Sequence, residues 1–307
     1  MLENHGDNAM TQLTMGPVLF NWQPEAWRDF YFRIADESPV DRVYVGEVIC
    51  SKRHPLFQHV FPDVIERLVA SGKEVVLSTL AEVMSKQDIK VVKSMTSSDD
   101  FIIEVNDVSA LSYLEDKNFY VGPLFNTYNE DSVSFLARKG AKHITLPTEL
   151  PASAISALGE TSKKLGITLE TQVFGRMSLA LSARCYHARA HNLRKDTCQF
   201  VCDNDPDGMA IHTTDDKPFL AINGIQTMSY PYLNLLNETH DLQKNGITHF
   251  RLSPHTVDMV AVSNIFRQVL DKKIESNEAE ILLSSLRPEA TFANGFYHHK
   301  EGIRNVV

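Results

Sequence analysis

Short apolar runs alternate along the chain with longer segments in which apolar residues recur at helical spacing. Eight runs predict strands, and several of them are apolar throughout, as expected for strands that are covered on both faces. The predicted strands span residues 17–22, 42–49, 74–79, 101–106, 119–126, 143–147, 168–174 and 249–253.

Apolar stripes predict amphipathic helices between these strands. One stripe is Val60, Phe61, Val64, Ile65 and Leu68, and another is Val257, Val260, Ala261, Ile265, Val269 and Leu270. Gly72, Gly140, Gly166 and Gly246 each follow a helical stretch and precede a strand, where a left-handed residue commonly ends a helix. The alternation predicts a TIM-barrel-like (β/α)₈ fold or a doubly wound open sheet, and eight strands over roughly 250 residues favour the barrel.

The repeat is interrupted once, and both ends of the chain differ from it. We expect a flexible lead at residues 1–15 and a barrel domain at 16–275, with an insertion at about 176–229 after the seventh strand. Long insertions in compact domains are usually functional or disordered. The tail, 276–307, contains Phe292, Phe296 and Tyr297, so we expect it to pack on the barrel or on a partner.

The composition is that of an ordinary globular protein: 307 residues, 43% hydrophobic, with a net charge of −9. An acidic chain needs a local basic patch to bind nucleic acid. Arg184, Arg189, Arg194 and Lys195 form one candidate, although charge compensation for neighbouring thiolates is the favoured interpretation. Without an apolar run of about 20 residues or a signal peptide, the chain is predicted to be cytoplasmic, where clustered cysteines more often bind metal than form disulfides.

The insertion carries three of the four cysteines: Cys185, Cys198 and Cys202. The fourth, Cys50, follows the second predicted strand. Loops after barrel strands meet at one face, so these thiols can converge there. The C-x12-C-x3-C spacing favours an iron–sulfur cluster over structural zinc, which uses tighter pairs. Four unrelated buried thiols remain the alternative.

Other side chains could take part in chemistry at that face. Glu47, Glu104, Asn106, Asn126, Glu149 and Gln172 lie near predicted strand ends. They could orient a substrate or move protons, or merely cap loops. His187 and His191, spaced i, i+4, are alternative metal ligands, and Arg184 could pair with a cluster or with an anionic substrate. No acid/base pair stands out, so catalytic residues stay unassigned.

Several sequence blocks resemble a known family. Residues 172–177, followed by Ser182-Ala-Arg-Cys185, resemble the signature of the collagenase-like peptidases. Blocks at 44–53, 74–80, 223–229 and 251–254 are similar to a branch of that family that acts in oxygen-independent ubiquinone biosynthesis. The peptidase label itself fits poorly, because the sequence has neither an HExxH zinc helix nor a GxSxG nucleophile motif.

The resemblance implies a 4Fe–4S cluster held by Cys50, Cys185, Cys198 and Cys202. It also implies a heterodimer with a homologous UbiU-like subunit, assisted by a UbiT-like lipid-binding protein. The implied reaction is hydroxylation of ubiquinone precursors without O₂, with prephenate as the oxygen donor. Two alternatives stay open: an O₂-independent RNA-base hydroxylase, and a non-catalytic subunit that transfers electrons or supports its partner.

Overall fold

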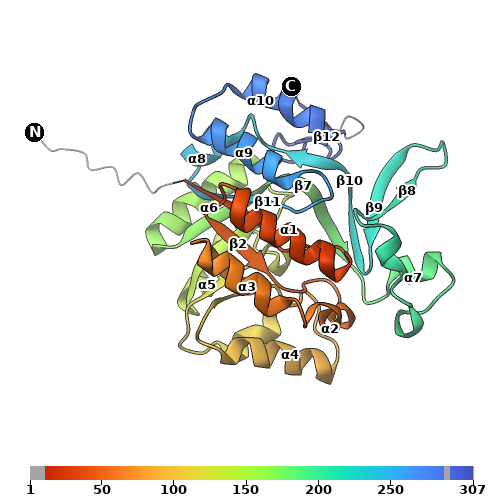
Figure 1. Cartoon of the computed structure of the whole chain (residues 1–307). Helices are drawn as coiled ribbons and strands as arrows, with labels where there is room; N and C mark the ends of the chain where they lie inside the picture. Colours follow the sequence, from red (N-terminus) through yellow and green to blue (C-terminus); the bar gives the residue numbers. More distant parts are fainter. Residues whose placement is uncertain (1–10, 287–290, 307) are drawn as a thin grey trace, which may run out of the picture.

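Eight parallel strands close into a barrel in the computed structural model, which describes residues 11–286 and 291–306 (Figure 1). The sheet closes because β11 pairs with β1 on one side and with β7 on the other. The expected TIM-barrel-like fold is therefore confirmed. Its strands are β1 (Gln12–Met15), β2 (Arg42–Val45), β3 (Glu74–Ser78), β4 (Ile102–Val105), β5 (Phe119–Val121), β6 (Ala141–Leu146), β7 (Thr168–Leu181) and β11 (Ile247–Leu252).

Helices pack outside the barrel and join its strands. They are α1 (Pro24–Glu37), α2 (His54–Phe57), α3 (Phe61–Ala70), α4 (Lys86–Ser97), α5 (Glu130–Arg138), α6 (Ala152–Leu165), α8 (Thr239–Lys244), α9 (Met259–Leu270) and α10 (Ser276–Leu286). The two predicted apolar stripes lie mainly on α3 and α9. Gly72, Gly140, Gly166 and Gly246 all have positive φ, as the helix-ending prediction requires. No helix within the described ranges has the length and apolarity to cross a bilayer.

The first strand lies earlier than predicted, so the prediction of a strand at 17–22 is wrong. Leu13 and Met15 are fully buried, and β1 pairs with both β2 and β11. The apolar run at 17–22 is instead a loop: Val18, Phe20 and Trp22 belong to the hydrophobic core, whereas Pro17 and Leu19 line a pocket at the barrel mouth. Part of the predicted flexible lead is thus a barrel strand, while residues 1–10 lie outside the described residues.

The insertion is an antiparallel extension of the barrel sheet. Strand β7 runs on to Leu181 because β10 (Gln226–Asn234) pairs with it beyond the barrel. Strands β9 (Pro218–Asn223) and β8 (Met209–His212) add to β10 and project from the molecule beside α7 (Tyr186–Ala190) (Figure 1). A lobe built in this way can hold side chains beside the barrel mouth instead of inside it.

The C-terminal segment packs on this chain's own barrel. Strand β12 (Phe292–Ala293) pairs with β10, and Phe292 and Phe296 pack against the hydrophobic core. Tyr297 is buried, and its hydroxyl donates a hydrogen bond to Asp241. These aromatic side chains therefore serve the fold of this chain.

A buried ion network fills the centre of the barrel. Arg251 donates to Glu104 at 2.5 Å and to Glu170 at 2.7 Å, and all three side chains are at least 96% buried. The guanidinium also lies over the Tyr44 ring, 3.9 Å from its centroid. Burial alone would raise the pKa of Glu170, but Arg251, His143 and Arg42 together outweigh that effect and hold the pKa well below its usual value.

We expect Arg251→Met to destabilise the fold strongly. Removal of the guanidinium takes the hydrogen-bonded cation away from the buried Glu104 and Glu170, which typically costs about 3–5 kcal/mol. Urea unfolding measures the loss. Arg28→Met is the control, because Arg28 forms its ion pair with the exposed Asp29 at the surface, and this variant should lose far less stability. Equal losses in the two variants would contradict this account of the network.

Candidate functional site

All four cysteines line one cavity beside the barrel mouth. Cys50 precedes the short 3₁₀ helix Ser51–Arg53 that follows β2. The other three come from the insertion: Cys185 caps the start of α7, Cys198 follows the 3₁₀ turn Lys195–Thr197, and Cys202 lies in the next turn, Val201–Asn204. The fold thus brings the remote cysteine and the clustered ones together.

The loop that carries Cys50 is held by a buried carboxylate. Glu47 accepts hydrogen bonds from the backbone N–H groups of Ile49 at 2.9 Å and Cys50 at 2.8 Å. Gly46 begins this loop with φ of +151°, and a Cβ there would lie 2.3 Å from the Ser78 carbonyl oxygen. Only glycine lets the loop approach β3 so closely. Glu47 was predicted as a barrel-rim residue, and the structure makes it the support of Cys50.

Cationic side chains surround the thiols. Lys52, Arg53 and Lys195 line the cavity, and the Lys52 ammonium lies 3.6 Å from the Cys198 sulfur. Burial raises the pKa of Cys50 and of Cys202, and the neighbouring Arg53 counteracts part of each rise. Metal ligation requires thiolates, so these cations favour the form of the thiols that binds metal.

The four thiols share a cavity, but they are not drawn together as closely as the ligands of a single bound ion. Tetrahedral zinc with Zn–S bonds of about 2.3 Å holds its sulfur ligands roughly 3.8 Å apart. Within the described ranges, one group of three His, Cys, Asp or Glu ligand atoms lies within 4.8 Å, and it contains none of the cysteines. Four thiols that share a cavity at wider spacing suit a four-iron cluster, which takes one thiolate at each corner.

That compact group consists of His187, His191 and Asp205. His187 is buried, lines the cysteine cavity and lies 2.8 Å from the Asp205 carboxylate through its Nε2 atom. The His187 and His191 rings stack with centroids 5.8 Å apart. The His187–Asp205 contact joins α7 to the segment after Cys202, so it supports the loop that carries the thiols.

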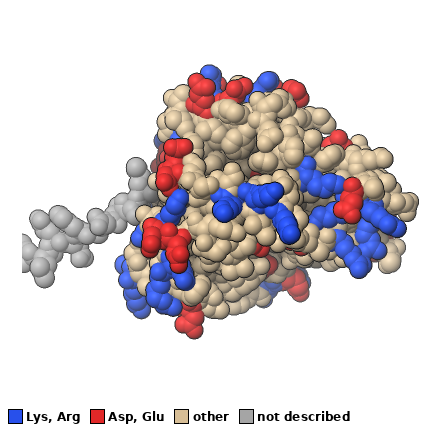
Figure 2. Space-filling model, turned by 90° about the horizontal axis from the view of Figure 1, so that it is seen from below, with Lys and Arg blue, Asp and Glu red and all other residues tan. Residues whose placement is uncertain are grey.

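Arg184 does not take the predicted role. It is exposed and lines neither the cysteine cavity nor the pocket at the barrel mouth. Arg184, Arg189 and Arg194 all lie on the surface of the insertion, and Figure 2 shows Lys and Arg side chains gathering on that lobe. Lys52 and Arg53, which do reach the thiols, lie two and three residues after Cys50, and this closeness in the sequence is the signal that could have identified them.

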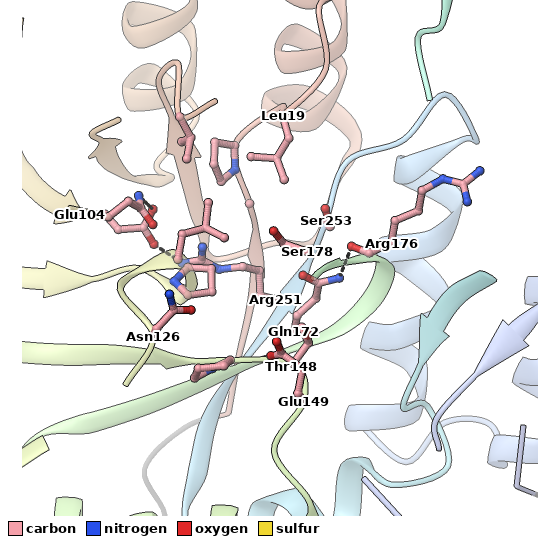
Figure 3. A pocket seen from close by; sticks show the side chains of 17 residues that line it. Leu19, Glu104, Asn126, Thr148, Glu149, Gln172, Arg176, Ser178, Arg251 and Ser253 are labelled. Carbon is pink, nitrogen blue, oxygen red and sulfur yellow. Dashed lines mark hydrogen bonds and ion pairs between the residues drawn. The ribbon is translucent and has the colours of Figure 1, made fainter. Parts of the chain in front are cut away.

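A second cavity opens at the barrel mouth itself (Figure 3). Five of the six predicted rim residues line it: Glu104, Asn106, Asn126, Glu149 and Gln172. Arg251 and its partner Glu104 also face it, and proline and leucine side chains add apolar surface. Burial raises the pKa of Glu149, so this carboxyl group holds a proton more readily than an exposed one.

The polar groups of this barrel-mouth pocket are fixed by neighbouring backbone. Asn106 donates to the Thr79 carbonyl and to Glu104, and Gln172 donates to the carbonyl oxygens of Gly175 and Arg176. Figure 3 shows the Arg176 side chain pointing away from the pocket. The lining therefore presents amides, the carboxyl groups of Glu104 and Glu149, the Arg251 guanidinium and apolar surface.

A small apolar cluster separates the two cavities. It consists of Val48, Ile49, Ala81 and Ile225, with Leu19, Leu124 and Cys185 packed against it. Leu19, Val48 and Leu124 line the barrel-mouth pocket, whereas Ile225 and Cys185 line the cysteine cavity. One layer of side chains thus stands between the thiols and the pocket.

One protein-family model matches most of this chain. The model of peptidase family U32 matches residues 28–306. The chain belongs to peptidase family U32. This is the collagenase-like family that the sequence blocks resemble, and the match covers the barrel strands from β2 onward, the insertion and most of the C-terminal segment.

Solved structures add only a general likeness. Orotidine 5'-monophosphate decarboxylase of Methanocaldococcus jannaschii is 12% identical with a TM-score of 0.40, and the match covers 89% of this chain and 99% of that one. The Bacillus cereus spore cortex-lytic enzyme SleL is 8% identical with a TM-score of 0.34, over 87% and 76% of the two chains. Likeness at this level carries no argument about function.

Asp207 anchors the end of the cysteine-bearing segment to the barrel. It accepts hydrogen bonds from the Thr256 backbone at 2.9 Å and hydroxyl at 2.6 Å, and it lies 3.3 Å from His255. Burial alone would raise the pKa of this carboxyl group, but His255 and Thr256 outweigh burial and hold the pKa far below its usual value.

We expect Asp207→Asn to lower the unfolding free energy by about 1–3 kcal/mol at neutral pH. A carboxyl group with a depressed folded pKa stabilises the fold above its unfolded pKa, near 3.9, and this contribution is lost as the pH falls further. The difference between wild type and variant should therefore stay constant above about pH 5 and shrink progressively below about pH 4. Urea unfolding of the metal-free chain measures it. A difference that does not change with pH would contradict the assignment.

Proposed function

We propose that this chain is the iron–sulfur subunit of an O₂-independent hydroxylase of ubiquinone precursors, of the UbiV type. The observation that carries the proposal is the convergence of Cys50 with Cys185, Cys198 and Cys202 in one cavity beside a barrel-mouth pocket. A bound 4Fe–4S cluster would supply one-electron chemistry or a binding position for an oxygen-bearing substrate. Cysteine-ligated clusters are damaged by oxygen, which suits a reaction that takes place without O₂.

The residues of the barrel mouth account for binding and proton handling in this proposal. Asn126 and Gln172 can position the polar substituents of an aromatic ring, and the proline and leucine side chains cover its faces. Glu149, whose pKa is raised, can hold a proton at the pocket rim. A prenylated ring is poorly soluble in water, so the proposal includes a UbiT-like lipid carrier, with a UbiU-like subunit as heterodimer partner and prephenate as oxygen donor.

We expect about four iron and four sulfide per chain after anaerobic reconstitution. Cys50→Ala should lose iron as completely as Cys185→Ala, because the remote thiol lines the same cavity as the clustered ones. Iron and sulfide analysis together with the visible spectrum measures both variants. Ser182→Ala is the control. Ser182 is half-buried and lies three residues before Cys185, and this variant should keep its iron. Full iron content in Cys50→Ala would defeat the four-thiolate site.

The reaction is tested in cells. A deletion strain should make ubiquinone normally in air but accumulate unhydroxylated precursors without oxygen. Cys198→Ala, in a chain that is still folded and expressed, should reproduce this defect because it removes a ligand of the proposed cluster. Lipid analysis of anaerobic cultures is the measurement.

Normal anaerobic ubiquinone in the deletion strain, with no second copy of the gene, would reject the proposed reaction. Loss of a hydroxylated RNA base in the same strain would instead favour the RNA-base hydroxylase. The exposed basic side chains of the insertion, Arg184, Arg189 and Arg194, are the feature that fits this second candidate. Neither outcome would bear on whether the four cysteines bind iron.

A further inference from the structure

Arg53 is the most deeply buried cation at the cysteine cavity. It ends the 3₁₀ helix that begins directly after Cys50, and its relative exposure is 1%. It lines the cavity with the four cysteines, and its charge acts on Cys202 and Cys50. A guanidinium is protonated at every physiological pH, so this position is permanently charged.

The charge of Arg53 has no carboxylate ion pair in the part of the chain that the structure describes. Glu47 acts on it from a greater distance, and that carboxylate already accepts the two N–H groups of the Cys50 loop. The buried Nε atom of Arg53 has no hydrogen-bond partner among the residues that the structure describes. A buried cation normally requires a close anion, because desolvation costs several kcal/mol. The thiolates of a loaded cavity would provide it.

The other two nitrogens of the same side chain reach toward the barrel mouth. Nη1 donates to the Leu19 carbonyl at 2.9 Å, and Nη2 donates to the Asn223 side chain at 3.0 Å. Asn223 in turn donates to the Leu19 carbonyl at 2.7 Å. The Leu19 side chain lines the barrel-mouth pocket (Figure 3). Arg53 therefore touches the cysteine cavity and the loop that covers the pocket.

We propose that Arg53 is a positioning residue that sets the reduction potential of the cluster in the cysteine cavity and ties that cavity to the barrel-mouth loop at Leu19. The inference rests on the proposed function insofar as it requires the cluster. Reduction adds one electron and makes the cluster more negative. A fixed positive charge beside Cys202 stabilises the reduced form and raises the potential.

The test is a redox titration of the anaerobically reconstituted full-length chain with dithionite, followed by EPR. At the wild-type midpoint, the ratio of reduced to oxidised cluster in Arg53→Gln should fall by about tenfold, because one nearby buried charge is lost. Arg28→Gln makes the same change of charge on a half-buried side chain away from the cavity, and should leave the ratio unchanged. Arg53→Gln with full iron and the wild-type midpoint would overturn the inference.

Arg53→Lys covers the case in which Arg53→Gln holds no cluster. Lysine keeps the charge but loses the fork that reaches Leu19 and Asn223 together, so it should restore iron binding with a midpoint close to wild type. If Arg53→Lys binds as little iron as Arg53→Gln while Arg28→Gln binds the full amount, the role of Arg53 as a counter-charge is rejected. A wild-type chain that binds no iron would reject the proposed function instead, so the two failures are distinguishable.

Discussion

The rest of the structure depends on one buried charge arrangement: Arg251 held between Glu104 and Glu170 inside the barrel. The three side chains come from β11, β4 and β7, so the network connects opposite walls of the sheet. Hydroxyl groups of Thr14 and Thr145 also donate to Glu170. Strands that are far apart in sequence thus meet around one guanidinium, whose burial is tolerated because every charge has a partner.

The same network forms the floor of the barrel-mouth pocket, because Arg251 and Glu104 both line it. Asn106, a further lining residue, is oriented partly by its hydrogen bond to Glu104. Closure of the barrel and arrangement of the pocket are therefore two results of one set of contacts. A ligand in this pocket would meet polar groups that are already fixed, so little reorganisation would accompany its binding.

The cysteine cavity follows a different principle, since it is built outside the barrel. The antiparallel extension from β7 and β10 carries three thiols beside the mouth, and the segment is fastened by Asp207 and by the Trp22 indole, which donates to the Pro206 carbonyl at 2.7 Å. Membership in peptidase family U32 describes the barrel and its insertion together. The proposed function departs from the family's name because the reactive groups gathered here are thiols surrounded by cations.

Local patterns in the sequence were sufficient for the alternation of strands and helices, the helix-ending glycines and the position of the cysteine-bearing insertion, because these depend on neighbouring residues. The first strand was misplaced because its position depends on residues that are distant in the sequence. Residues 17–22 are apolar because most of them are buried in a loop, with Val18, Phe20 and Trp22 in the hydrophobic core, whereas the short β1 is defined by pairing with β11, more than 200 residues away. Only the pairing of strands in the closed sheet shows that β1 is a strand and that residues 17–22 form a loop.

The candidate site, like the fold, was predictable from the sequence only in part. Residue type and spacing pointed to the four cysteines, and strand ends pointed to five of the residues that line the pocket. The tertiary structure alone turned Glu47 toward the Cys50 backbone, left Arg184 on the surface and buried Arg53. A charged residue in a sequence is expected to be solvated, and only the approach of distant segments can supply the partners that offset its desolvation.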